Sequence, residues 1–293
     1  MYELIQISEH DYYIDCPAKI GVVRISDTDV ALIDSGSDKD AGKKVLKALD
    51  ANGWQLRAVY VTHSHADHIG GCKLIQDRTG CKVFAPGLEQ AYTLHPELEP
   101  AGLYGGLPFK DIQNKFMMAQ PCNAELLTED VLPEGWTIIE LPGHSFDMAG
   151  FLTPDGNAYI ADSLSSEETL AKYGIGYLWD PARALESLEM LKALNAKKYV
   201  PAHAEVTENI SALAETNIKA ILGVEDALLE ICGEACTFED ILQKIFSRYA
   251  MTMNVQQYML IGSTVRSYLS ALYTDGRLSY DFSDGKMLWR KNG

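Results

Sequence analysis

The sequence predicts an α/β protein that ends in a helical region. Three observations support this fold class. Residues 2–34 alternate apolar and polar side chains in short runs, apolar strands then alternate with helices up to about residue 208, and the remaining periodicity is mainly helical. The 293-residue length suits one large domain or two ordinary ones. We therefore expect one domain at 1–208 and a second region at 209–293.

The first part of the chain is expected to form antiparallel strands. Its apolar runs are separated by polar turns such as 26–29, and the last run ends in Asp34-Ser35-Gly36. A helix is predicted over 38–51 because its apolar side chains fall on one face. A buried strand is predicted next, over 56–61, from a second apolar run. This strand leads into the most informative stretch of the chain.

Three histidines and an aspartate lie within six residues just after that strand, in a chain that has seven histidines. His63 and His65 are two residues apart, so in extended backbone both side chains face the same way and reach one ion. Asp67 and His68 come after the bend, and we expect them to reach a second ion nearby. Imidazole and carboxylate groups bind zinc, iron or manganese. The stretch therefore predicts a metal site on a strand-to-helix turn.

Three later strand ends carry side chains of the same kinds. His144 follows the predicted strand 137–141 after a Pro-Gly pair, and Asp162 follows the strand 158–160. His203 follows the short strand 199–200. Asp162 has two carboxylate oxygens and is expected to bridge two ions. Each of these signals is weak alone, but their order along the chain is informative.

The pattern H-x-H-x-D-H at residues 63–68, followed by the three later positions, resembles that of the metallo-β-lactamase-fold hydrolases, and the resemblance covers residues 1 to 208. It implies an αββα sandwich of two mixed sheets. It also implies two metal ions, with zinc expected and iron or manganese as alternatives. The implied ligands of the two ions, in the glyoxalase-II-like arrangement, are His63, His65 and His144 for one, Asp67, His68 and His203 for the other, and Asp162 between them.

Four further residues are candidates for supporting roles. In the family, a D-x-G element at a strand end lies beside the metals, so Asp34 is expected to orient a ligand. The alternative is a turn carboxylate next to a glycine. His95 is a candidate pocket residue, although a lone histidine is often structural. Tyr173 and Tyr177 are candidates because they lie in a Tyr- and Gly-rich segment before a predicted helix.

Residues 88–125 interrupt the alternation of predicted strands and helices. Glycines and prolines break up weak helical pieces, yet the segment is rich in large apolar side chains. A long irregular insertion in a compact domain is usually a lid or binding loop, so we expect a flap over the active site. The alternatives are a packed surface excursion and a contact between subunits.

The C-terminal region, 209–293, is expected to contain three helices and a hairpin, an order that resembles a winged helix. A winged helix suggests DNA binding. However, this region has eight Lys or Arg against ten Asp or Glu, and the whole chain has a net charge of −16. Nucleic acid is therefore an unfavoured partner. We expect a packing role or a homodimer contact instead.

Composition also bears on location. The six cysteines form no C-x-x-C pair and are expected to be reduced and mostly buried. The N-terminus has no signal-peptide pattern, and no apolar run is long enough to span a bilayer. We expect a cytoplasmic protein that acts on a small molecule.

The expected activity is hydrolysis of a small ester, thioester or lactone by a metal-bridging hydroxide, with Asp67 and Asp162 as the catalytic carboxylates. Two divalent ions lower the pKa of bound water from 15.7 toward ~7. The alternative is a phosphodiesterase or nuclease of the same superfamily. A diiron oxygen reductase is less favoured, because that branch has glutamate where His65 stands and adds a flavin domain.

Overall fold

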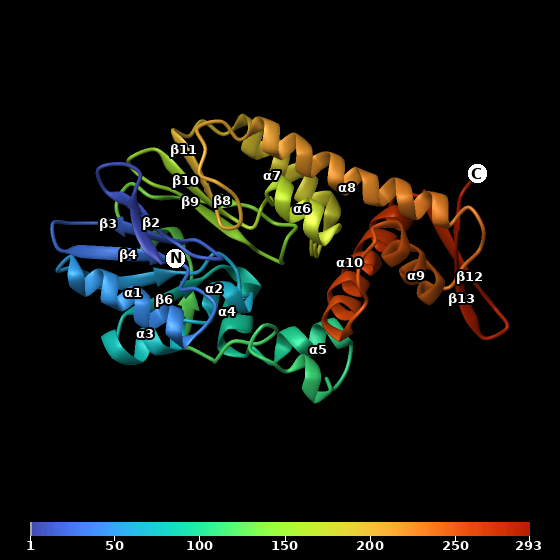
Figure 1. Ribbon diagram of the computed structural model, residues 1–293, viewed down its shortest axis with the longest axis horizontal. Helices are drawn as coiled ribbons and strands as arrows, with labels where there is room; N and C mark the ends of the chain where they lie inside the picture. The colour runs from blue at the N-terminus through green and yellow to red at the C-terminus, as the bar shows by residue number, and fades with distance from the viewer. Residues whose placement is uncertain (1) are drawn as a thin grey trace.

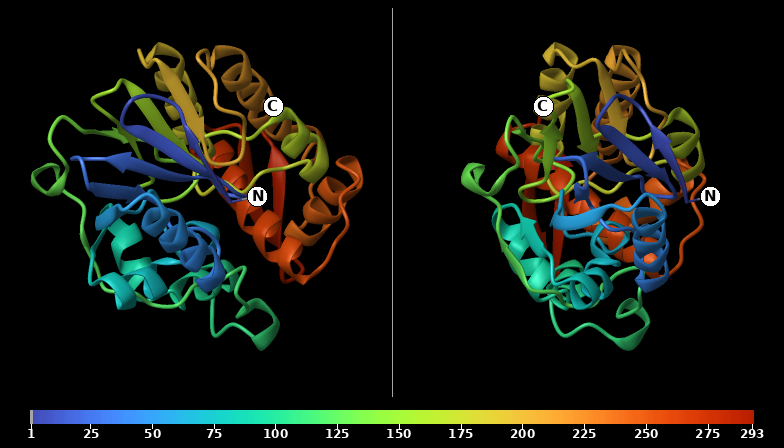
Figure 2. Two further views of the ribbon diagram at one scale, coloured as in Figure 1. Left: turned by 60° about the vertical axis from the view of Figure 1, so that its left-hand side comes forward. Right: turned by 90° about the vertical axis from the view of Figure 1, so that its left-hand side faces the viewer.

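The computed structural model describes residues 2–293. Two sheets pack face to face, and helices cover the outer side of each, which gives four layers in the order αββα (Figures 1 and 2). The fold class predicted from the sequence is confirmed, including the mixed character of both sheets.

The larger sheet has seven strands in the order β1 to β7. Strands β1 to β4 pair antiparallel, and β4 to β7 pair parallel. The strands are β1 Glu3–Gln6, β2 Asp11–Asp15, β3 Ile20–Arg24, β4 Asp29–Ile33, β5 Gln55–Tyr60, β6 Lys82–Ala85 and β7 Ala124–Leu126.

The smaller sheet has four strands in the order β11-β10-β9-β8. Strands β10 and β11 are parallel, whereas β8, β9 and β10 form an antiparallel meander. The strands are β8 Thr137–Glu140, β9 Ala149–Leu152, β10 Asn157–Ala161 and β11 Lys198–Pro201. Aromatic residues from both sheets, among them Tyr60, Phe151 and Tyr159, fill the space between them.

Helices cover the outer faces. On the larger sheet, α1 contributes Val45 and Leu49 and α3 contributes Ile75 to an apolar cluster with the strands. On the smaller sheet, α7 and α8 form the outer layer. The helices are α1 Lys39–Ala51, α2 Ala66–Ile69, α3 Cys72–Thr79, α4 Gly87–Leu94, α5 Leu98–Tyr104, η1 Lys110–Ile112, η2 Glu129–Val131, α6 Glu167–Tyr173, α7 Pro181–Ala193, α8 Ser211–Ile231, α9 Phe238–Arg248 and α10 Val255–Thr274.

Parallel pairing brings several strand ends together. Strands β4 and β5 run in the same direction, so the residues that follow them meet at one edge of the larger sheet. Strands β10 and β11 do the same in the smaller sheet. The loops after these four strands carry Asp34, His63, Asp162 and His203. The topology therefore gathers these side chains at one edge of the sandwich.

The insertion, residues 88–125, has more regular structure than the sequence suggested. It contains most of α4, then α5 and η1, and it ends in β7, which pairs with β6 as the last strand of the larger sheet. Helix α5 and the η1 turn contact α10 of the C-terminal region (Figure 1). The segment thus joins two parts of the molecule that lie far apart in the sequence.

The C-terminal region consists of α8, α9, α10 and a hairpin of β12 Leu278–Ser283 and β13 Lys286–Lys291. Its apolar side chains belong to the same cluster as those of the smaller sheet and α7. The apolar core is therefore continuous across residue 208. The division at 208 and the winged-helix description remain predictions.

All six cysteines are buried and free, as expected. Among residues 2–293, no helix combines the length and apolarity that a membrane crossing requires.

Candidate metal centre

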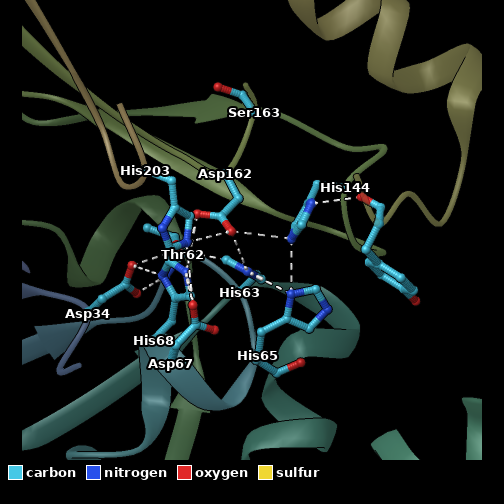
Figure 3. Close-up of polar contacts among 12 residues, drawn as sticks. Asp34, Thr62, His63, His65, Asp67, His68, His144, Asp162, Ser163 and His203 are labelled. Carbon is cyan, nitrogen blue, oxygen red and sulfur yellow. Dashed lines mark hydrogen bonds and ion pairs between the residues drawn. The ribbon is translucent and has the colours of Figure 1, made fainter. Parts of the chain in front are cut away.

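The seven residues proposed as metal ligands lie together at the shared edge of the two sheets (Figure 3). They come from four loops: the β5–α2 turn, the loop after β8, and the ends of β10 and β11. The ligand atoms fall into three overlapping groups within 4.8 Å: His63, His65 and His144; His63, His68 and Asp162; and Asp67, His68 and His203.

The first group presents three imidazole nitrogens to one point. His65 Nδ1 lies 3.0 Å from His63 Nε2 and 3.0 Å from His144 Nε2. Two nitrogens bound to one tetrahedral zinc at ~2.05 Å would be about 3.3 Å apart. The spacing of the three nitrogens therefore suits one metal ion.

The other two groups share His68 and combine imidazole with carboxylate. His203 Nε2 lies 3.3 Å from Asp67 Oδ2 and 3.2 Å from Asp162 Oδ2. Asp162 Oδ2 is also 3.5 Å from His144 Nε2, and Asp162 Oδ1 is 3.2 Å from His68 Nε2. Asp162 thus lies between His144 of the first group and the pair His68 and His203, in the place expected of a bridging carboxylate.

Two buried atoms test whether this set suits a metal. His68 Nε2 and Asp162 Oδ1 are both buried, and although they lie 3.2 Å apart, neither forms a hydrogen bond with the other or with another group of residues 2–293. Buried polar atoms without partners are costly and rare. A cation between them would satisfy both, so the donor set fits divalent metal ions of the kind that imidazole and carboxylate groups bind.

Burial keeps the histidines of the first group neutral. It lowers the pKa of His65 and of His144 to about 4, and it lowers the pKa of His63 well below its ordinary value. Neutral imidazole is the form that donates a lone pair to a metal.

The carboxylates favour positive charge at His68 and His203. The charge of Asp162 raises the pKa of His203 to about 10. Burial works against protonation of His68, but the charges of Asp162 and Asp67 outweigh it and raise its pKa well above the ordinary value. The two carboxylates thus attract cationic charge to this half of the site.

Asp34 lies directly behind His68. It accepts hydrogen bonds from His68 Nδ1 at 2.7 Å and from the backbone N–H and hydroxyl of Thr62, both at 2.8 Å. The bond from Nδ1–H fixes the ring so that Nε2, the atom available to a metal, is aimed at the site. Asp34 also has φ 64°, so it is a turn residue as well as an orienting group.

The other ring nitrogens are held in similar ways. Because the Thr62 hydroxyl donates to Asp34, it accepts from His63 Nδ1 at 3.0 Å. His144 Nδ1 and His203 Nδ1 lie 3.2 and 2.8 Å from the backbone oxygens of Tyr177 and Pro17. These contacts turn Nε2 of each ring toward the shared point.

Two glutamates that the sequence did not single out also support the site. Buried Glu89 of α4 accepts from Ser64 N and from Asp147 N, so it ties the loop of His65 to that of His144. Glu99 of α5 places Oε1 3.8 Å from His65 Nε2. Burial, and then the charge of Glu89, raise the pKa of Glu99 to about 8.

The three candidate pocket residues have different positions. The ring of Tyr177 packs against His65 and His144, with centroids 5.2 and 5.8 Å away. Tyr173 is half exposed beside Lys172 and lines a hollow that also contains His203. The structure does not bring His95 to the site, because it follows α4 with its side chain exposed and paired with Glu97.

Comparison with known proteins identifies the family. The model of the metallo-beta-lactamase superfamily matches residues 13–203. The chain belongs to this superfamily. Among curated relatives, a hydroxyacylglutathione hydrolase from Methylobacillus flagellatus is 30% identical over 62% of this chain and 63% of its own length. Another, from Rhodopseudomonas palustris, is 28% identical over 55% and 54%. The match thus spans less than two thirds of these relatives.

Solved structures of this superfamily share the fold over nearly the whole chain. A metallo-beta-lactamase family protein from Thermus thermophilus has a TM-score of 0.74 at 17% identity, covering 96% of this chain and 97% of its own. A beta-lactamase domain protein from Burkholderia ambifaria has a TM-score of 0.75 at 18% identity, covering 99% and 94%. The shared fold therefore includes the C-terminal helices.

Proposed function

We propose that this protein is a metal-dependent hydrolase of thioesters that holds two divalent ions. One observation carries the proposal: seven imidazole and carboxylate groups from four loops converge, with an unpartnered nitrogen and an unpartnered oxygen buried among them. The curated relatives, named hydroxyacylglutathione hydrolases, support a thioester as the substrate.

The two ions, when bound, would supply a Lewis acid for the substrate carbonyl and lower the pKa of a water molecule from 15.7 toward ~7. The chain's own groups would position the reactants. Asp67 is the most exposed of the seven residues, with 44% of its side chain accessible, so it is placed to accept a hydrogen bond from the attacking water. Buried His63 and His68 would hold the metals rather than contact the substrate.

The thiol part of the substrate is a separate question. The sequence match covers only part of the hydroxyacylglutathione hydrolases, so their specificity for glutathione does not transfer automatically to this protein.

The charge of the chain bears on the alternative substrate. The chain has a net charge of −16, which disfavours polyanions such as nucleic acid. We therefore place a small thioester ahead of a phosphodiester.

The test combines metal content with a substrate panel. Protein loaded with zinc, iron or manganese is assayed on an oxyester, a lactone, thioesters of glutathione and of a simpler thiol, and bis-p-nitrophenyl phosphate. We expect about two metal ions per chain and turnover that is fastest on a thioester. Turnover of the phosphodiester alone would transfer the assignment to the nuclease branch.

Two variants and a control connect that activity to the site. His63→Ala and Asp162→Ala should each lower metal content and reduce turnover by more than a thousandfold. His95→Ala removes a histidine that is exposed and belongs to none of the three ligand groups, so it should leave both quantities unchanged. Full activity in Asp162→Ala would contradict the proposal.

A further inference from the structure

A small, partly open cavity adjoins the metal centre. His144 and Asp162 form part of its wall, so it opens directly on the proposed ligands. The remaining wall comes from α6, the loop before α7, α7 itself, α8 and α10. The apolar residues that carry the argument are Leu170, Ile175, Leu188, Ala220, Ile221 and Val224.

Two polar side chains in this wall, Asn217 and Ser163, are already hydrogen-bonded to backbone groups. Asn217 accepts from the backbone N–H of Ser165 and donates to the backbone oxygens of Ser165 and Leu213, each at 2.9 Å. The Ser163 hydroxyl donates to the Ile160 oxygen at 2.8 Å. The wall therefore offers an occupant mainly apolar contact, apart from the metal-centre residues at one end.

We propose that this cavity is the subsite for the acyl group of the substrate, and that it selects short, apolar acyl groups. The inference rests on the proposed function. A carbonyl held at the metal centre beside His144 and Asp162 would direct one of its two substituents into the cavity. Apolar walls favour a hydrocarbon substituent there.

The size of the cavity decides which substituent enters. Its volume is about 80 Å³. A cavity of about 150 Å³ lined by apolar side chains admits benzene, so this one has room for roughly three or four carbon atoms. Glutathione and other thiol carriers are far too large. The acyl group is therefore the part of a thioester that fits.

A second hollow, on the His203 side, suits the thiol. It is open to solvent, measures about 640 Å³, and includes the side chains of Lys19 and Lys172. Ser165 belongs to the walls of both spaces, so a substrate can extend from one to the other past the metal centre. This arrangement places the acyl group and the thiol group of a thioester on different sides of the metal centre.

The C-terminal region thus has a role in selectivity. It supplies Asn217, Ala220, Ile221 and Val224 from α8, and Tyr268 from α10. Side chains on these helices set the depth of the cavity, whereas the metal ligands all come from earlier residues.

The first experiment measures kcat/KM for acetyl, butyryl, hexanoyl and octanoyl thioesters of one thiol. Each methylene that enters an apolar pocket contributes about a fourfold gain. Butyryl should therefore exceed acetyl by about fifteenfold, and octanoyl should fall at least tenfold below the optimum. Equal efficiency along the series would overturn the inference.

Two variants with opposite effects on volume extend the test. Ala220→Phe fills the cavity and should bring the butyryl-to-acetyl ratio close to one, while acetyl turnover stays within a few fold. Ile221→Ala enlarges it and should move the optimum to hexanoyl. Leu222 on the same helix is exposed, so Leu222→Phe and Leu222→Ala are matched controls that should leave the profile unchanged. Circular dichroism checks that each variant folds.

Binding of acetate, butyrate and octanoate, measured by NMR titration, separates this inference from the proposed function. If no thioester is hydrolysed but butyrate binds best and Ala220→Phe abolishes that preference, the cavity assignment stands and the reaction assignment fails. If thioesters are hydrolysed but neither variant changes the chain-length profile, the reaction stands and the acyl subsite is refuted.

Discussion

The substitution Asp34→Asn tests how the protein prepares His68 for a metal. Asparagine has the same shape and tolerates the left-handed backbone at this position, where φ is 64°. Only the hydrogen-bonding character changes. In the native protein one carboxylate oxygen accepts from Thr62 N, while the other accepts from the Thr62 hydroxyl and from His68 Nδ1.

An amide can satisfy only part of this pattern. If its NH₂ group faces His68 Nδ1, it donates to the ring and moves the ring proton to Nε2, the atom proposed to bind metal. If its NH₂ group faces Thr62 N–H instead, two donors oppose each other in a buried position. Loss of a group that orients a ligand lowers metal affinity by about 10- to 100-fold, or ~1.4–2.7 kcal/mol. The opposed donors cost about 1–3 kcal/mol of unfolding free energy.

The assay has two parts and a matched control. Competition with a chromophoric chelator measures zinc affinity, and denaturant unfolding measures the stability of the metal-free protein. Ser35→Ala is the control, because the Ser35 hydroxyl bonds buried backbone groups of His68 and Gly71 but does not touch the ring. Both variants should lose stability, and only Asp34→Asn should lose zinc affinity. Equal zinc affinity in the two variants would refute the reasoning.

Three further predictions concern other parts of the fold. Because the pKa of Glu99 is about 8, Glu99→Gln should weaken zinc binding by severalfold above that pH, where the carboxylate 3.8 Å from His65 Nε2 is ionised, and should change it little below. Exposed Glu97→Gln should change it at neither pH, and identical chelator titrations of the two variants would contradict this. For Asp155, burial opposes ionisation, but hydrogen bonds from Ser8 and His10 outweigh it and hold its pKa below the ordinary range. Its stabilising effect is therefore present above about pH 4 and is lost as pH falls through the lowered pKa. Unfolding of Asp155→Asn should show a deficit of about 1.5–3 kcal/mol at pH 7 that shrinks in acid, and a pH-independent deficit would count against it. Gly71→Ala should destabilise the protein by about 1–3 kcal/mol, because the new Cβ would lie 2.3 Å from Ser35 O. Gly223→Ala, in open space on α8, should instead stabilise the protein by up to ~1 kcal/mol. Thermal melts that rank the two variants the other way would be inconsistent with the packing.

Much of the candidate site could be predicted because metal chemistry restricts residue type and spacing. His63, His65 and His68 are close in sequence, and parallel strands bring His203 and Asp162 to a common edge. The strands were recognisable because their apolar runs are short and end in turn residues. Local pattern and topology were sufficient for this part.

The remaining features depend on contacts that are distant in sequence. The role of Glu99 depends on α5 lying over His65 and packing against α10, and no local pattern indicates either contact. Strand β7 is only three residues long and is a strand because β6 pairs with it. The sequence also suggested His95 as a pocket residue, because histidine is a common ligand. In the structure it follows α4 and its side chain faces solvent.

The continuous core across residue 208 has a consequence for the order of folding during synthesis. Every strand of the larger sheet and both of its covering helices, α1 and α3, lie within residues 3–126, so this half can assemble early. The smaller sheet is different, because α7 and α8 form its outer layer, and these helices in turn pack against α9 and α10, whose buried residues extend to Leu272. This outer layer is complete only after α8, Ser211–Ile231, has been made, and the apolar faces of α7 and α8 are covered only after α10 follows. The nascent protein is therefore most prone to aggregate, and most dependent on chaperones, while residues 209–274 are being made.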